Sequence, residues 1–198
     1  LDPDEYYTRN YADFNIFNEL QTNSINLNVV DMKFQGELRW KPVTGLELSA
    51  LGAVKYNSSS QEHKIRESSN QSMAYRAMDD ATMRDANNWL YTDPDVLNSL
   101  PFSVLPKGGF YNKTDYRMFS YDFRASATWN KVFNDDHILS LFAGLEAKAQ
   151  DRSNNDFQGW GMQYENGEIP YFDYHAFKKM REGNSNYYNL KNTKSRTV

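Results

Sequence analysis

The chain has 198 residues, of which 39% are hydrophobic and 15% aromatic, with 14 Tyr and 12 Phe and a mean hydropathy of −0.82. Its net charge is −4 without a Lys/Arg-rich run, which argues against binding nucleic acid through phosphates, and its aromatic content argues against plain disorder. The absence of Cys excludes disulfides, thiolate zinc sites and a Cys nucleophile. The sequence contains no run of 18 apolar residues, so it predicts no transmembrane helix.

The chain opens with a polar segment and continues into a predicted hairpin. Residues 1–23 are rich in Asn and Asp and predict a loop, with a short ordered turn near 14–17. Residues 24–56 predict a hairpin, because apolar and polar side chains alternate on both sides of the Pro- and Gly-containing turn at 41–45. The apolar positions include Val30, Met32, Phe34, Leu38, Trp40, Leu46, Leu48, Ala50, Val54 and Tyr56, and the polar ones include Lys33, Glu37 and Arg39. The period of two predicts one apolar and one polar face.

A long connection follows, over residues 57–117. The spacing of Met and Ala predicts a helix within 69–90, which Asp93-Pro-Asp95 ends. The segment 105–112 is rich in turn-forming residues. The connection also carries too many apolar groups for a flexible linker, so we expect it to be ordered and partly helical.

The alternating pattern then returns in residues 118–149, which predict a second hairpin turning at 130–137. Its apolar face carries Phe119, Tyr121, Phe123, Ala125, Ala127, Trp129, Leu139, Leu141, Ala143, Leu145, Ala147 and Ala149, and its polar face includes Arg124 and Glu146. A second long, Gly-containing connection covers about 150–190, and a fifth strand is predicted near Thr193.

Short turns therefore alternate with very long connections, which is typical of a transmembrane β-barrel and unusual in a compact soluble domain. A strand of roughly 11 residues, tilted by about 40°, spans the ~25 Å apolar band of such a barrel. Trp40 and Trp129 lie beside the short turns, and Tyr56, Phe119 and Tyr121 lie beside the long loops, as two interfacial girdles would require. Four or five strands cannot close a barrel, and an open sheet cannot lie in lipid with unpaired edges. We therefore expect the chain to be a fragment of a larger barrel. The alternative is a soluble or secreted all-β glycan-binding module.

Several segments together resemble one family, the SusC/RagA-type TonB-dependent outer-membrane transporters. They are Phe17-Asn-Glu-Leu20, Val30-Asp-Met-Lys-Phe-Gln-Gly-Glu37, Tyr75-Arg-Ala77, Leu90-Tyr-Thr-Asp-Pro94, Leu105-Pro-Lys-Gly-Gly-Phe-Tyr-Asn112, Ala143-Gly-Leu-Glu146 and Gly159-Trp-Gly-Met-Gln-Tyr-Glu-Asn-Gly167. The likeness covers nearly the whole chain in the family's order. No single segment is a mechanistic motif. The combination of these segments in this order is what makes the resemblance specific.

The resemblance implies an all-β fold, part of a 22-stranded antiparallel barrel in the bacterial outer membrane, with residues 1–23, 57–117 and 150–190 as extracellular loops. It implies import of oligosaccharides, or peptides in some members, with a SusD-like surface lipoprotein as lid and TonB as energy source. The plug domain and TonB box of that family are not among these residues.

Catalysis has little support in the sequence. His63, His137 and His175 are far apart, and no hydrolase, zinc-protease, Walker or dinucleotide motif occurs. The acidic segments 79–80, 93–95 and 151–156 are better explained as solvated loops or helix caps than as calcium sites. We therefore predict no enzyme, cofactor or metal. The candidate contacts to ligand or lid are loop aromatics, which suit sugar rings and protein interfaces: Trp89, Tyr91, Phe110, Tyr111, Trp160 and Tyr164. The alternative, expected for at least half of them, is that they pack the small cores of the loops.

Overall fold

A computed structural model describes residues 2–105, 107–133, 137–183 and 188–198. It is mostly β, with 61% strand and 16% helix, and its sheets are antiparallel. None of the helices within these ranges has both the length and the hydropathy needed to cross a membrane. The all-β part of the prediction is therefore confirmed.

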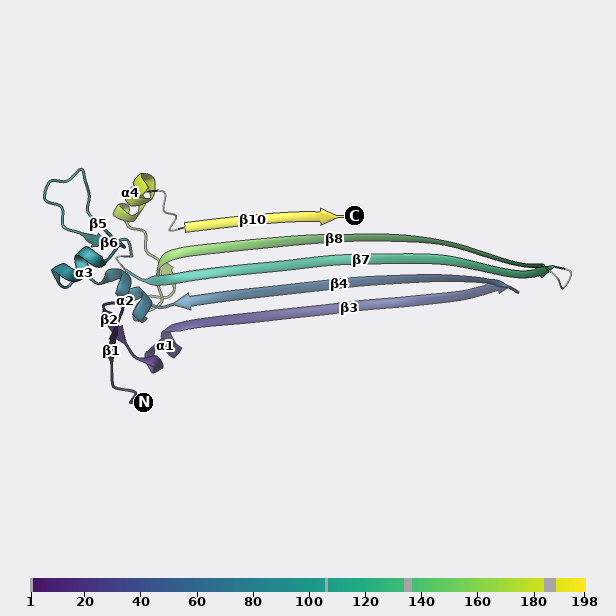
Figure 1. The fold of residues 1–198 in the computed structure, drawn as a ribbon, viewed down its shortest axis with the longest axis horizontal. Coiled ribbons are helices and arrows are strands. Elements are labelled where there is room, and N and C mark those ends of the chain that lie inside the picture. Colours follow the sequence, from purple (N-terminus) through teal and green to yellow (C-terminus); the bar gives the residue numbers. More distant parts are fainter. Residues whose placement is uncertain (1, 106, 134–136, 184–187) are drawn as a thin grey trace. The chain divides into compact units, whose positions relative to one another are not determined.

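Five long strands form the main sheet, in which neighbours along the chain are also neighbours in space (Figure 1). In sheet order they are β10 (Tyr188–Thr197), β8 (His137–Gln163), β7 (Gly109–Phe133), β4 (Leu46–Ile65) and β3 (Asn23–Val43). The short β9 (Ile169–Pro170) pairs with the end of β8. The strands of both predicted hairpins and the fifth strand are present, and residues 134–136 of the turn predicted at 130–137 lie outside the described residues.

The strands extend well beyond the predicted hairpins at 24–56 and 118–149. β4 continues to Ile65, β7 begins at Gly109 and β8 continues to Gln163. The added segments, such as 57–63 and 112–117, are polar on both sides, so they carry no apolar alternation to reveal a strand. The connections predicted at 57–117 and 150–190 are correspondingly shorter.

The loops hold small elements of their own. The N-terminal segment, predicted as a loop, contains the antiparallel pair β1 (Tyr7–Arg9) and β2 (Ala12–Phe14), and helix α1 (Ile16–Thr22), capped by the Asn15 side chain. The helix predicted within 69–90 is two helices, α2 (Asn70–Arg76) and α3 (Ala81–Ala86), because Asp80 starts a new helix by accepting from the Met83 N–H. The strands β5 (Leu90–Tyr91) and β6 (Phe102–Ser103) form a pair, and α4 (Tyr174–Gly183) precedes β10.

Contacts divide the chain into two units. We name 1–27, 61–114 and 155–191 the loop unit, and 28–60, 115–154 and 192–198 the strand unit. In the loop unit, Ile65, Leu105 and Phe110 form one buried cluster, and Val104 and Ala176 form another. Trp160 packs against both clusters, so the loop unit has a small core of its own.

A glycine pair allows the backbone to approach closely beside this core. Gly108 has a φ of +78°, and a Cβ there would lie 2.4 Å from the carbonyl carbon of Gly161. A Cβ on Gly109 would lie 1.8 Å from the carbonyl oxygen of Ile65. Glycine is therefore required at these two positions of the turn-rich segment 105–112, because any side chain would collide with the neighbouring backbone.

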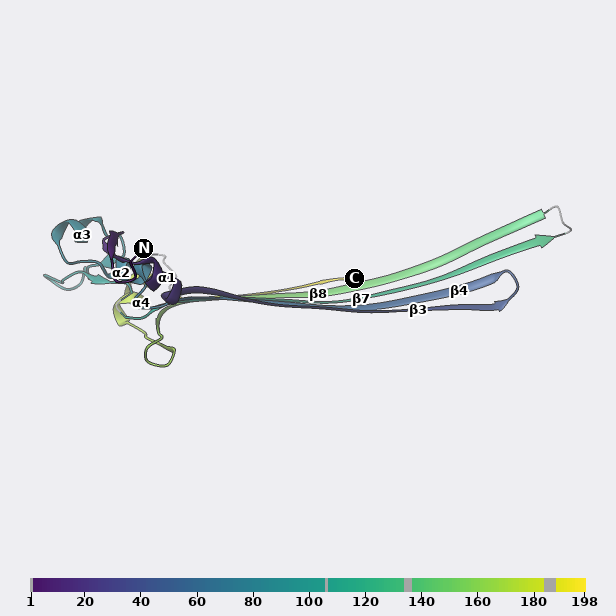
Figure 2. The same cartoon turned by 90° about the horizontal axis from the view of Figure 1, so that it is seen from below.

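The strand unit sorts its side chains onto two faces. In Figure 2, β3, β4, β7 and β8 of this unit lie in one layer, so both faces are open within the described residues. One shallow groove is lined by apolar residues such as Leu38, Trp40, Leu48, Ala127 and Leu145. Another is lined by Lys33, Gln35, Lys55, Asp122, Arg124 and Lys148. These two sets are the apolar and polar faces that the alternation predicts.

The apolar face is strongly exposed to its surroundings. The exposed fractions are 70% for Phe34 and 69% for Leu38 on β3, and Phe123 on β7 and Leu141 on β8 are also exposed. The opposite face is linked by polar contacts between strands: Lys55 lies 3.3 Å from Asp31, and Arg124 lies 3.2 Å from Glu146. A sheet with one solvated face and one bare apolar face needs an apolar environment on the latter side.

Candidate functional site

The loop unit contains a groove of about 440 Å³ that combines aromatic rings with amide side chains. Its walls come from the turn between β1 and β2, from α1 and the start of β3, from α2, and from the segment that follows α3. The lining residues with ligand-binding chemistry are Arg9, Asn10, Tyr11, Phe14, Glu19, Asn23, Gln71, Tyr75, Asn88 and Trp89. We name this cavity the amide–aromatic groove.

One buried amide holds the first wall in place. Asn70 is only 5% exposed, and its side-chain N–H groups donate to the carbonyl oxygens of Arg9, Ala12 and Asp13 at 2.8, 3.1 and 3.1 Å. The backbone N–H of Asn70 donates to a Glu19 carboxylate oxygen. These bonds tie the turn of the first hairpin to the start of α2, although some 60 residues separate them in the chain.

The turn that Asn70 holds is conformationally unusual. Asn10 and Tyr11 have φ values of 52° and 61°, in the left-handed region that non-glycine residues rarely adopt. Arg9 lies over the Phe14 ring at 5.1 Å. Backbone strain of this kind persists only where surrounding contacts fix it, and it is concentrated at binding sites.

A second amide positions the aromatic wall. The Asn87 side chain donates to the Ala77 carbonyl oxygen at 2.8 Å and accepts from the Trp89 N–H at 3.0 Å. The Trp89 ring stacks on Tyr75, with 4.3 Å between centroids and 12° between planes. Trp89 remains 41% exposed, so one ring face is fixed by packing while part of the ring is open to the groove.

Trp89 is the only one of the six aromatic residues predicted from the sequence that lines this groove, as far as the described residues show. Phe110 and Tyr164 are 3% and 9% exposed, and the Tyr164 hydroxyl donates to the Phe110 carbonyl oxygen at 2.6 Å. Burial raises the pKa of Tyr164. Trp160 packs between the two core clusters. Phe110 and Tyr164 are therefore buried away from a ligand, and Trp160 is partly buried against the core.

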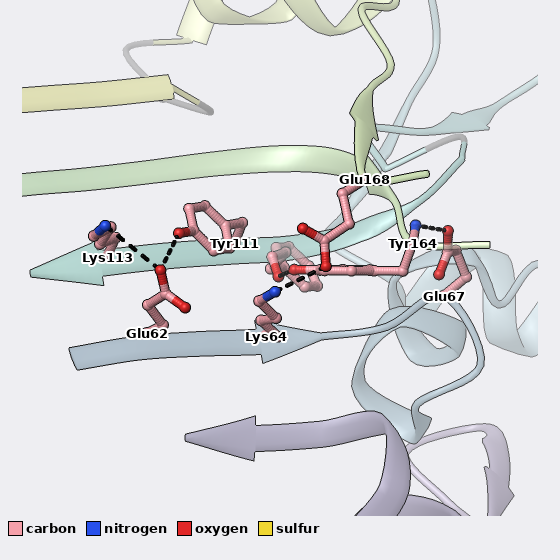
Figure 3. Close-up of polar contacts among 8 residues, drawn as sticks. Glu62, Lys64, Glu67, Tyr111, Lys113, Tyr164 and Glu168 are labelled. Atoms are coloured by element: carbon pink, nitrogen blue, oxygen red, sulfur yellow. Dashed lines mark hydrogen bonds and ion pairs between the residues drawn. The ribbon is translucent and has the colours of Figure 1, made fainter. Parts of the chain in front are cut away.

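The other two predicted aromatics lie in polar contacts elsewhere in the loop unit. The Tyr111 hydroxyl donates to Glu62 at 2.9 Å, in the network of Figure 3. The Tyr91 hydroxyl donates to Glu182, and burial, followed by this bond, raises the pKa of Tyr91 to about 12. The structure therefore does not bring the six residues together into one site.

The network in Figure 3 connects strands β4 and β7 to the segment after β8. Its ion pairs are Lys113 with Glu62 at 3.5 Å and Lys64 with Glu168 at 2.8 Å. The backbone N–H of Tyr164 donates to a Glu67 carboxylate oxygen at 2.6 Å. These ion pairs and hydrogen bonds join elements of the loop unit that are far apart in the chain.

The histidines do not form a site either. His63 shares a 2.7 Å hydrogen bond with Asn23, and burial lowers the pKa of His63. His175 lies against Phe102, with 4.2 Å between ring centroids. Across the described ranges, no three His, Cys, Asp or Glu side chains are grouped so that they could hold a metal ion.

The amide–aromatic groove combines ring faces with amide and carboxylate groups. Ring faces can give apolar contact, the Asn10, Gln71 and Asn88 amides can donate to or accept from hydroxyl groups, and the Glu19 carboxylate can accept from them. A neutral, hydroxyl-rich molecule matches this mixture. Sequence reasoning missed the amides because surface Asn and Gln follow no period and come from segments far apart in the chain.

Comparison of the chain with protein-family models gives no match, and a search of curated proteins finds no similar sequence.

Proposed function

We propose that the chain is a barrel segment of a SusC/RagA-type TonB-dependent transporter of the bacterial outer membrane. The observation that carries the proposal is the bare apolar face of a single-layered antiparallel sheet, on which Phe34 and Leu38 are about 70% exposed. Soluble proteins rarely expose so continuous an apolar surface. Lipid would cover this face, and the opposite, charged face would line the lumen.

The remaining parts of the proposal follow from the resemblance. Further strands would pair with β3 and β10 to complete a barrel of 22 strands around a plug, and TonB would supply energy through that plug. A SusD-like lipoprotein would cover the extracellular side. The amide–aromatic groove supports oligosaccharides as the imported substrate, because it offers both ring faces and hydroxyl-binding amides.

Labelling of single cysteines tests the topology, because these 198 residues contain no Cys. In intact cells, Asn98→Cys, in the connection between β5 and β6, should react with a membrane-impermeant maleimide. Thr44→Cys, in the turn between β3 and β4, should react only after the outer membrane is permeabilised. The unsubstituted protein is the control for other cysteines. Equal labelling at both positions in intact cells would refute the proposed orientation.

A soluble glycan-binding module is the second candidate, since the amide–aromatic groove and the core of the loop unit lie within one unit and need no membrane. Cell fractionation distinguishes the two candidates. A transporter segment appears in the outer-membrane fraction and needs detergent for extraction. A protein that is monomeric and folded in plain buffer would favour the soluble module.

A further inference from the structure

We propose that the sheet carries a binding site for the phosphate headgroup of an anionic outer-leaflet lipid, at the loop-side end of its apolar face. This inference rests on the proposed function, because it requires that face to contact lipid. It is carried by a groove of about 470 Å³ in the strand unit, lined by Tyr56, Arg117, Phe119, Asp151, Lys194 and Arg196.

The basic side chains of this groove share a face with apolar residues. Arg196 donates to the Tyr121 hydroxyl at 3.3 Å and lies 3.4 Å from Asp151. Tyr121 belongs to the alternating apolar set of β7, so Arg196 lies on the apolar face of the sheet. Alternation places Lys194 beside Arg196 on β10, and Arg117 beside Phe119 on β7.

The charge of the groove is strongly positive although the chain as a whole is acidic. Three basic residues that share the apolar face, Arg117, Lys194 and Arg196, surround one carboxylate, in a chain with a net charge of −4. Asp151 is occupied by Arg196. Within the described residues, neither Arg117 nor Lys194 has an ion-pair partner, so both are available to an anion.

The position of the groove favours a lipid over a soluble anion. Tyr56 and Phe119 are the aromatic residues that end the apolar strand segments on the loop side, which is the level of the headgroups if the face contacts lipid. Guanidinium and ammonium groups at that level bind phosphate by charge-assisted hydrogen bonds. The adjoining apolar strip, including Phe123, would contact the acyl chains of the same lipid.

The test measures the affinity of the purified protein, in dodecylmaltoside micelles, for fluorescent phosphatidic acid. Unlabelled phosphatidylcholine and inorganic phosphate serve as competitors. Each basic residue near a headgroup contributes about fivefold, so Arg117→Gln with Lys194→Gln should weaken binding roughly 25-fold. The matched control is Lys33→Gln with Lys148→Gln, which removes the same charge from the polar face and should leave affinity unchanged.

Three results would overturn the inference. The first is equal loss in both double variants, which would mean a general charge effect. The second is undiminished binding in Arg117→Gln with Lys194→Gln. The third is competition by inorganic phosphate as strong as that by the lipid, which would mean a site for a soluble anion. Outer-membrane insertion of the unsubstituted protein, measured in parallel, separates the two proposals: insertion without lipid selectivity refutes only this inference, and failure to insert refutes both.

Discussion

At the scale of single residues, the amide–aromatic groove depends on Trp89, whose ring is held on one side by Tyr75. If the groove binds sugar rings, Trp89→Ala should weaken ligand binding about two- to thirteenfold, because one aromatic contact is worth about 0.5–1.5 kcal/mol beyond area burial. Isothermal titration with candidate oligosaccharides measures this effect. Leu97→Ala is the control, since Leu97 is 92% exposed in the same unit and does not line the groove. Similar losses in both variants would refute a specific role for Trp89.

Gly109 illustrates a different residue-scale constraint, namely contact between backbones. Gly109→Ala should destabilise the loop unit by about 1–3 kcal/mol, because the new methyl group meets the Ile65 carbonyl oxygen and one of the two segments must shift. Thermal unfolding followed by tryptophan fluorescence measures the loss. Gly183→Ala, where a Cβ meets no atom within 4 Å, should be neutral or slightly stabilising. An unchanged transition for Gly109→Ala would mean that the close approach is not required.

At the scale of elements, helix α4 is joined to the segment after β5 by Lys178, which lies 2.5 Å from Asp93 and 2.6 Å from Asp95. The hydrogen bond from Lys178 lowers the pKa of Asp93, and the same bond raises the pKa of Lys178. A lowered carboxyl pKa means that the stabilisation is complete above the usual carboxyl pKa of 3.8 and is lost as pH falls through the lower pKa of the folded state. A raised ammonium pKa means that the stabilisation by Lys178 is complete below the usual lysine pKa of 10.5 and is lost only as pH rises through the higher pKa of the folded state.

The attachment of α4 should therefore be constant from about pH 4 to pH 10 and weaken outside that window. Hydrogen exchange in α4, corrected for the intrinsic pH dependence, reports it. Lys178→Met should increase exchange in α4 at pH 7 and remove the acid dependence. Arg181→Met removes the same charge from an exposed position of the same helix and should change neither. Unaltered acid dependence in Lys178→Met would assign the effect to another group.

At the scale of the whole molecule, a membrane barrel should tolerate a new charge on the lumen-facing side of a strand but not on its lipid-facing side. Leu38→Arg puts a charge on the face assigned to lipid and should destabilise the inserted state by about 2–4 kcal/mol if the position is near the midplane. Glu37→Arg, one residue earlier on the charged face, should be tolerated. The amount of heat-modifiable, folded protein in the outer membrane measures both. Equal assembly of the two variants would contradict the assignment of faces.

The faces could be predicted from sequence because alternation is a local signal, and β3, β4, β7 and β8 each contain enough apolar positions to reveal it. The outer parts of the same strands could not, because residues such as Ser59, Ser60 and Gln61 are polar at successive positions and the period of two disappears. The amide–aromatic groove could not be predicted either. Asn10 and Gln71 line one groove because Asn70 bonds to the segment of the first hairpin, and nothing in the sequence distinguishes that Asn from its neighbours.

The loop unit is assembled from three stretches of chain, 1–27, 61–114 and 155–191, and this has a consequence for the order of folding. Its core needs Ile65 and Phe110 from the second stretch and Trp160 from the third. Closing such long intervals costs chain entropy before any contact repays it. The unit should therefore be among the last parts of this chain to become protease-resistant during biogenesis, and a ribosome- or translocon-arrested chain ending before residue 155 should leave residues 61–114 open to cleavage.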